Sequence, residues 1–206
     1  MSALQPMQRY KLLTGLVVPR PIALVTTRDR DGIVNAAPFS FFNAMGADPP
    51  VVVIGIGKRP AGHPKDTVQN VLDGSDFVVN IVDEALAEAM NICAIDLPAG
   101  TSELKAAGLT AVNSKQIVVP YIAESPASFE CRQRQVIDIG SNRIVLGEIV
   151  HIHLRDNLFD EEHFYVLTEK LHAIGRMHGG GWYTRTGDTF NMPRWASLEE
   201  ALAKDA

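Results

Sequence analysis

Short β-type runs follow one another along most of this 206-residue chain, with only brief helical segments between them. Residues 20–27, 33–43 and 51–57 are rich in β-branched or aromatic side chains and predict three strands. Asp31 and Gly32, between the first two, form a dipeptide typical of a hairpin turn. A doubly wound parallel sheet would need a long helix after each strand. The pattern therefore predicts a mainly β fold, an antiparallel barrel with short helical insertions.

The rest of the chain continues this alternation. Pro38 lies inside the second run and has no backbone N–H, so we expect the strand to bulge or bend there. Because no repeat, low-complexity run or linker interrupts the pattern, we predict a single domain over residues 1–206. Further strands are predicted at residues 76–82, 128–139 and 143–154, and helices at residues 66–74, 83–94, 101–108 and after Ser197.

Composition excludes several classes of function. The formal net charge of −5 gives no overall attraction to nucleic acid or to an anionic membrane. The strongest apolar run, residues 51–57, is about a third of the length of a membrane span, and the N-terminus has no signal-peptide core. The two cysteines, Cys93 and Cys131, are too few for a disulfide framework or a zinc pattern, so we expect buried thiols. A cytoplasmic protein that binds neither nucleic acid nor membrane is expected.

A basic cluster stands out in this acidic chain. Lys58, Arg59, His63 and Lys65 lie in one short segment just before a predicted helix, with Asp66 or Thr67 as its N-cap. A helix N-terminus with a lysine and a hydroxyl beside it suits a phosphate group. A solvated basic loop ahead of an ordinary capped helix fits these residues as well.

Read together, several segments resemble one family. The runs RPIALVTT, GIVNAAPFSFFN, KDTVQN, FVVN, SPASFEC, IVLGEIVHIH and GRMHGGGWY occur in this order over roughly residues 15–195. Each is weak alone, but the ordered set resembles the flavin reductase-like, FMN-binding split-barrel family, which includes flavin reductases and flavoredoxin-type proteins. The resemblance implies a split antiparallel β-barrel and a homodimer that holds FMN near its interface.

The resemblance also implies site residues. The loop with Lys65 and Thr67 would hold the FMN phosphate, and Asp66 would orient it. The run "HGGGWY" is more crowded with glycine than the usual family pattern, which makes its assignments the least direct. The other residues implied to bind or cover the flavin are Thr26, Thr27, Ser40, Phe41, Phe42, Asn43, Arg176, Trp182 and Tyr183.

The function that the resemblance implies is an FMN-binding oxidoreductase. We expect an NAD(P)H-dependent flavin reductase, with NADH or NADPH as co-substrate, that supplies reduced flavin or electrons to an oxygenase or another acceptor protein. One alternative is an FMN electron carrier of flavoredoxin type without its own NAD(P)H activity. Another is a split-barrel binding module that has lost flavin. Because the hydride chemistry belongs to the cofactors, no catalytic side chain is expected.

Other kinds of site are less favoured by the sequence. His151 and His153 are two residues apart on a predicted strand and project from the same face, which could suit a metal. No third ligand is evident nearby in the sequence, although His163, His172 or His178 could come close in space. A structural or site-lining role is preferred, and no metal is expected. No G-x-S-x-G segment occurs, and Cys93 has a spacing typical of core packing, so we expect no nucleophilic catalysis.

Overall fold

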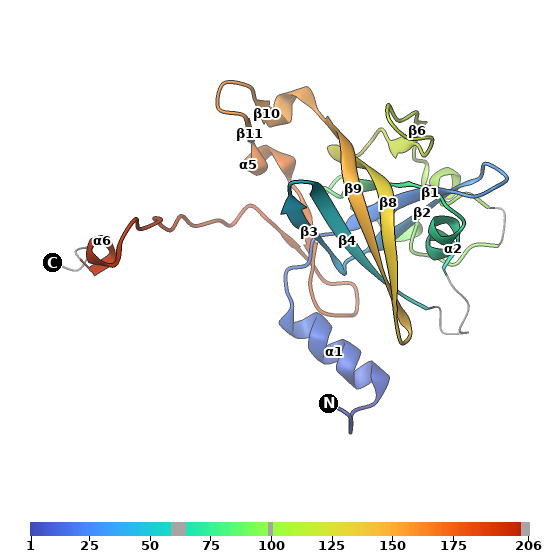
Figure 1. The fold of residues 1–206 in the computed structure, drawn as a ribbon, viewed down its shortest axis with the longest axis horizontal. Helices are drawn as coiled ribbons and strands as arrows, with labels where there is room; N and C mark the ends of the chain where they lie inside the picture. The colour runs from blue at the N-terminus through green and yellow to red at the C-terminus, as the bar shows by residue number, and fades with distance from the viewer. Residues whose placement is uncertain (59–64, 99–100, 203–206) are drawn as a thin grey trace.

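The computed structural model describes residues 1–58, 65–98 and 101–202, and its centre is one antiparallel sheet of seven strands (Figure 1). The order across the sheet is β2-β1-β5-β8-β9-β4-β3. The bounds of these strands are β1 (Ala23–Arg28), β2 (Val34–Phe39), β3 (Phe42–Ala47), β4 (Pro50–Gly57), β5 (Phe77–Ile81), β8 (Ala127–Ile139) and β9 (Asn142–Leu154).

Smaller elements surround the sheet. Three two-stranded ribbons pair β6 (Ala111–Val112) with β7 (Tyr121–Ile122), β10 (Phe159–Asp160) with β11 (Tyr165–Val166), and β12 (Ile174–Arg176) with β13 (Tyr183–Arg185). The helices are α1 (Pro6–Leu16), α2 (Asp66–Leu72), α3 (Ala87–Ile92), α4 (Glu103–Ala107), α5 (Thr168–Leu171) and α6 (Leu198–Leu202), with a 3₁₀ turn at Asp156–Leu158. No helix within the described residues is both long and apolar enough to cross a membrane.

The sheet curls into a barrel that stays open between two of its strands. β2 and β3 follow each other in the chain, with only Ser40 and Phe41 between them, yet they stand at opposite ends of the strand order. Two edges this close along the chain can belong to one sheet only if the sheet bends round on itself. The backbone N–H of Gly55 on β4 donates to the Phe41 carbonyl at 2.7 Å across this corner. The prediction of a mainly β, split antiparallel barrel is confirmed.

The prediction of a bulge at Pro38 is wrong. β2 pairs with β1 in unbroken register, and Pro38 lies directly opposite Leu24. The missing backbone N–H of Pro38 removes no hydrogen bond between strands, because β2 is an edge strand and pairs only with β1. The chain bends instead at Ser40 and Phe41, and the register shift falls between Ala44 and Gly46 on β3.

Apolar side chains fill both faces of the curled sheet. On β1, Val25 belongs to the cluster enclosed by the barrel, whereas its neighbour Leu24 belongs to a second cluster under α3 and α4. Alternate residues of a strand point to opposite faces, so one strand serves both clusters. Gly147 on β9 leaves room for the Phe77 ring, because a Cβ at that position would collide with it.

The short helices follow the sequence prediction with corrections at their ends. α4 begins after Ser102 and ends at Gly108, whose φ of 67° is left-handed, as expected of a glycine C-cap. The N-cap of α2 is Lys65 rather than Asp66 or Thr67, so the predicted side-chain cap there is wrong. α3 spans only Ala87–Ile92, because Asp83 forms an isolated β-bridge with Ala173 and residues 84–86 form a turn.

The ends of the chain lie outside the barrel. α1 was not anticipated from the sequence and packs at one end of the molecule, whereas residues after β13 leave the barrel and end in α6 (Figure 1). Ser197 accepts a hydrogen bond from the backbone N–H of Glu200 at 3.2 Å, as expected of an N-cap. Phe190 and Met192 on this final segment are 84% and 72% exposed, which is unusual for side chains of their size.

Candidate functional site

A cavity of about 610 Å³ lies at the corner where the chain passes from β2 to β3. Its volume falls in the range of small-molecule sites. We call it the lysine cavity, because Lys58 and Lys65 both line it. Its remaining lining residues are Tyr10, Pro38, Phe39, Ser40, Phe41, Gly55, Gly57, Ser141 and Asn142. The cavity thus brings together Ser40, Phe41 and Lys65, three of the residues predicted to bind the flavin.

A buried arginine, Arg20, stabilises the turn at Ser40 and Phe41 by hydrogen bonding. The Arg20 side chain is 4% exposed and its Nε donates to the Ser40 hydroxyl at 3.2 Å. Its other nitrogens donate to the carbonyl oxygens of Thr14, Val17 and Met177. Burial lowers the pKa of Arg20, but four hydrogen bonds to oxygen keep the charged form satisfied. Arg20 therefore ties α1, the β2–β3 turn and the C-terminal segment together at the cavity.

Phe41 presents an aromatic surface beside the cavity. Its side chain is 43% exposed and its ring centroid lies 6.3 Å from that of Tyr10. A Cβ at Gly55 would lie 3.1 Å from the Phe41 Cβ, so a side chain at this position would crowd the turn. The glycine therefore keeps β4 close to Phe41 and leaves space open above the strand.

Lys65 stands where the lysine cavity meets a smaller one of about 70 Å³. Its Nζ lies 5.2 Å from the centroid of the Phe39 ring, a cation–π contact that places the charge over apolar surface. The smaller cavity is also lined by Asp66 and Thr67. The Thr67 side chain is buried and its hydroxyl accepts a hydrogen bond from Asn35 Nδ2 at 2.9 Å. The structure therefore brings Lys65 and Thr67 together, whereas Arg59 and His63 lie outside the described residues.

Thr26 and Thr27 lie inside the protein. Both are 0% exposed, and neither lines the lysine cavity. The Thr26 hydroxyl donates to the Pro120 carbonyl at 2.7 Å, and the Thr27 hydroxyl accepts from Asn70 Nδ2 at 3.0 Å. Their hydrogen bonds tie β1 to the segment before β7 and to α2.

Phe42 and Asn43 begin β3 and point to different surroundings. Phe42 is half-buried and packs against the barrel core. Asn43 is exposed, and its side-chain oxygen accepts the backbone N–H of Ala44 at 2.9 Å. Neither residue lines the lysine cavity, although both directly follow the turn that does.

Arg176, Trp182 and Tyr183 meet on the β12–β13 ribbon. Arg176 and Tyr183 are cross-strand partners, and the guanidinium carbon lies 4.6 Å from the centroid of the tyrosine ring. Trp182 is 63% exposed. The ribbon is joined to the cavity through Arg20, since Arg20 and Arg176 exchange backbone hydrogen bonds at 2.9 and 2.8 Å. Arg176 itself is half-buried, and none of these three residues lines the lysine cavity.

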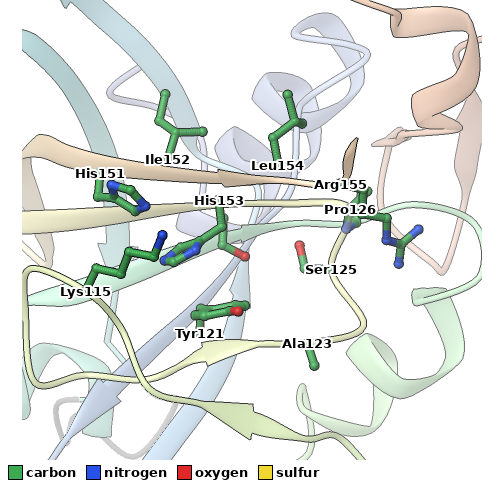
Figure 2. Close-up of a pocket in the computed structure, with 11 residues that line it drawn as sticks. Lys115, Tyr121, Ala123, Ser125, Pro126, His151, Ile152, His153, Leu154 and Arg155 are labelled. Atoms are coloured by element: carbon green, nitrogen blue, oxygen red, sulfur yellow. The ribbon is translucent and has the colours of Figure 1, made fainter. Parts of the chain in front are cut away.

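A second cavity of about 350 Å³ lies at the far end of β9 (Figure 2). We call it the histidine cavity, because His151 and His153 line it with their ring centroids 4.6 Å apart. This confirms that the two side chains share one face. The His153 ring also stacks on Tyr121, with centroids 4.0 Å apart. Its remaining lining residues are Lys115, Ala123, Ser125, Pro126, Ser128, Ile152, Leu154 and Arg155.

Glu130, behind His153, is 0% exposed. Its carboxylate accepts the backbone N–H groups of Lys115 and Gln116, each at 2.7 Å, and lies 2.6 Å from His153 Nε2. Burial alone would raise the pKa of Glu130, but the two N–H donors and His153 outweigh it and leave the pKa below its ordinary value. Glu130 is therefore an ionised buried carboxylate with its oxygens already hydrogen-bonded.

Glu130 also completes a set of potential metal ligands. One ligand atom from each of Glu130, His151 and His153 lies within 4.8 Å of the others. Sequence spacing did not indicate Glu130 as a third ligand, because it is the pairing of β8 with β9 that places Glu130 opposite His151. In the structure, the Glu130 oxygens accept hydrogen bonds from groups of the protein itself.

Sequence reasoning missed Arg20 and Tyr10 as well as Glu130. No local pattern marks Arg20, because its four acceptors come from segments up to 157 residues away. Tyr10 enters the lysine cavity from α1, a helix with no clear apolar periodicity in its sequence. The two cysteines are buried and unpaired, as predicted, and burial raises the pKa of Cys93 to about 12, so this thiol is inert at neutral pH.

The chain is similar to a known family of proteins and to several solved structures. Residues 15–175 match the model of the flavin reductase like domain. The 2-nitrobenzoate 2-nitroreductase of Pseudomonas fluorescens is 42% identical, with a TM-score of 0.87 over 96% of each chain. Nitrilotriacetate monooxygenase component B of Bacillus cereus is 33% identical, with a TM-score of 0.88 over 93% of this chain and 96% of that one. A split barrel domain protein of Shewanella frigidimarina, at 22% identity, shares the fold with a TM-score of 0.80 over 94% and 96% of the chains.

Proposed function

Since this chain belongs to the flavin reductase-like family, we propose that it is an FMN-binding oxidoreductase that uses NADH or NADPH. The observation that carries the proposal is the lysine cavity. In a chain with net charge −5, two lysines and an exposed phenylalanine line one cavity of about 610 Å³. Such a cavity combines an aromatic surface for a flat ring with positive charge for a phosphate.

The residues present fit this cofactor. Phe41 and Ser40 would contact the ring system, and Lys65 would hold the phosphate, with Lys58 as a second cation on the same cavity wall. Thr67 accepts a hydrogen bond from Asn35, so its own hydroxyl proton can be donated to a phosphate oxygen, and Asp66 would order the turn. Thr26 and Thr27 would act indirectly, by holding β1 against its neighbours. A bound flavin would supply the hydride chemistry, and the chain would supply binding and orientation.

The neighbouring β3 and ribbon residues would shape the outer edge of the site. Phe42 would fix the turn from the core side, and Asn43 would face the ligand or a second copy of the chain. Arg176, Trp182 and Tyr183 would cover the site from the ribbon that Arg20 ties to the turn.

We propose that the reduced flavin or its electrons pass to another acceptor. The support is the 33% identical nitrilotriacetate monooxygenase component B, a protein named as one component of a monooxygenase. A second candidate is direct transfer to a small nitroaromatic acceptor, favoured by the 42% identical 2-nitrobenzoate 2-nitroreductase. An electron carrier without NAD(P)H activity is the third.

A visible absorption experiment separates these candidates. The purified protein is mixed with FMN, and NADH and then NADPH are added without oxygen. Flavin bands that bleach support the reductase, and subsequent recovery on adding 2-nitrobenzoate supports the nitroaromatic acceptor. Bands that bleach only with dithionite indicate the carrier. If no FMN binds, the flavin proposal is wrong.

We propose that the protein works as a homodimer. The support is exposed apolar surface in two places. The final segment carries Phe190 and Met192 away from the barrel, and β3 is an edge strand on which Met45 is 60% exposed. A long apolar edge strand is normally covered in a stable protein. Light scattering should give a dimer mass, and replacing Phe190 and Met192 together by serine should shift it toward the monomer. A monomer mass for the unaltered protein would contradict the proposal.

We further propose that residues 1–206 form one domain and that His151 and His153 bind no metal. Both apolar clusters pack on the same seven-stranded sheet, which supports the single domain. The Glu130 carboxylate already accepts two backbone N–H groups and contacts His153, which supports a structural role for the histidines.

A further inference from the structure

We propose that the histidine cavity is a binding site for a small organic carboxylate, separate from the lysine cavity. No residue lines both cavities. A volume of about 350 Å³ is at the lower end of the range for ligand sites, so it suits a small molecule rather than a dinucleotide. This inference goes beyond the flavin chemistry proposed above and does not depend on it.

Positive charge at the two ends of the cavity points to an anion. Figure 2 shows the Lys115 and Arg155 side chains at opposite ends of the view, with His153 and Tyr121 between them. Arg155 is held in place, because it lies 3.5 Å from Asp83 and donates to the Glu124 carbonyl. Lys115 is exposed, and within the described part of the chain its ammonium makes no ion pair. Lys115 is therefore the group best placed to meet an incoming carboxylate.

The buried Glu130 carboxylate does not compete with a ligand for the positive charge of Lys115. Ionised Glu130 can only accept hydrogen bonds, so His153 Nε2 must carry the proton that lies between them. The two backbone N–H groups and His153 together compensate the Glu130 charge. The arrangement fixes the orientation of the His153 ring and leaves Nδ1 as the ring nitrogen not used by Glu130.

Aromatic and apolar groups also line the cavity between the two cations. The Tyr121 ring stacks on the His153 ring, and Ala123 and Pro126 lie on the same side as Tyr121 (Figure 2). The two lining serines are already engaged. The Ser125 hydroxyl lies 2.7 Å from the carbonyl oxygens of both Ile81 and Ala127, and the Ser128 hydroxyl donates to Asn80 Oδ1. A ligand with a compact apolar body and one carboxylate fits such walls better than a bare inorganic anion.

Benzoate, with neutral benzamide and inorganic phosphate as comparison ligands, tests the inference by calorimetric titration. The protein is first saturated with FMN, and the titration is repeated without FMN. In both, benzoate should bind at least about fivefold more tightly than benzamide or phosphate, because only benzoate combines charge with an apolar ring. Benzoate binding that disappears when FMN is present would place it in the lysine cavity and overturn the inference.

Matched variants locate the site. Lys115→Met keeps the apolar stem of the side chain and should weaken benzoate about tenfold. Lys65→Met in the other cavity and exposed Lys170→Met should leave benzoate affinity within about twofold. FMN affinity should be unchanged in Lys115→Met, which separates this test from that of the flavin proposal.

Two results would overturn the inference. One is equal benzoate affinity in Lys115→Met and the unaltered protein. The other is stoichiometric Zn²⁺ uptake that is lost in His151→Ala, together with no benzoate binding, because this would make the cavity a metal site.

Discussion

The two cavities use polar side chains in opposite ways. Around the histidine cavity, Glu130 is completely buried and hydrogen-bonded on both oxygens by the protein itself. Around the lysine cavity, Lys65 lies over the Phe39 ring at a cavity wall, and Phe41 is 43% exposed. Removing the buried Glu130 carboxylate should therefore affect stability, and removing the Lys65 ammonium should affect ligand binding.

The difference has a physical cause. A buried ionised group remains stable only if every donor and acceptor around it is paired, so each member depends on the others. A lysine at a cavity wall has solvent as an alternative partner, so its loss costs the fold little. The following experiments test whether the two regions are as distinct as the structure indicates.

The largest effect is expected for Glu130→Ala. The change leaves the backbone N–H groups of Lys115 and Gln116 without their acceptor in a buried site. We expect a loss of about 3 kcal/mol in the free energy of unfolding, measured by urea titration. The exposed Glu162→Ala is the control and should change stability by less than about 0.5 kcal/mol. Similar losses of unfolding free energy in the two variants would mean that the hydrogen bonds of Glu130 do not stabilise the fold.

The next effect is expected at the lysine cavity. Lys65→Ala combined with Thr67→Ala should weaken FMN about a hundredfold and riboflavin much less, because only FMN carries the phosphate. Fluorescence titration of both flavins measures the difference. Lys65→Ala alone is the companion variant, since Thr67 also accepts from Asn35 and its loss affects packing. Equal losses for FMN and riboflavin would remove the assignment of a phosphate site.

A smaller effect is expected from pH. The pKa of Glu130 in the folded protein is lowered relative to the unfolded chain, so its contribution to stability is fully present above the ordinary glutamate pKa of about 4.3. That contribution is lost as the pH falls through the lower folded pKa. The stability difference between the unaltered protein and Glu130→Gln should therefore shrink between pH 6 and pH 3, as measured by urea midpoints at each pH. A difference that stays constant would show that the Glu130 charge is not involved.

No effect is expected from chelation. Treatment with EDTA should leave both the unfolding midpoint and any flavin reduction unchanged, because the Glu130 oxygens serve protein donors rather than a metal. Metal analysis of the untreated protein is the companion measurement. A midpoint that falls with EDTA and returns with Zn²⁺ would make His151 and His153 metal ligands.

Local patterns predicted the elements better than they predicted contacts. Most predicted strands, the Gly108 cap and the Ser197 cap follow from short-range chemistry and agree with the structure to within a few residues. The strand predicted at residues 33–43 is the exception, because it is broken at Ser40 and Phe41 into β2 and the start of β3. The prediction of a bulge at Pro38 was wrong. A missing backbone N–H destabilises a strand only where a neighbouring strand would accept its hydrogen bond, and whether β2 has such a neighbour is a property of the whole sheet. The side-chain cap of α2 was wrong for a similar reason, since the Thr67 hydroxyl is engaged by Asn35 on β2.

The class of fold, the positions of most strands of the main sheet and the basic segment in an acidic chain can be read from the sequence alone. Periodicity, turn residues and charge are local properties, and short segments are enough to reveal them. The support of the Ser40 turn by Arg20 and the contact of Glu130 with His153 appear only in the folded protein. Both contacts join residues 20 or more positions apart, and their partners are set by strand pairing and sheet curvature, which no short segment encodes.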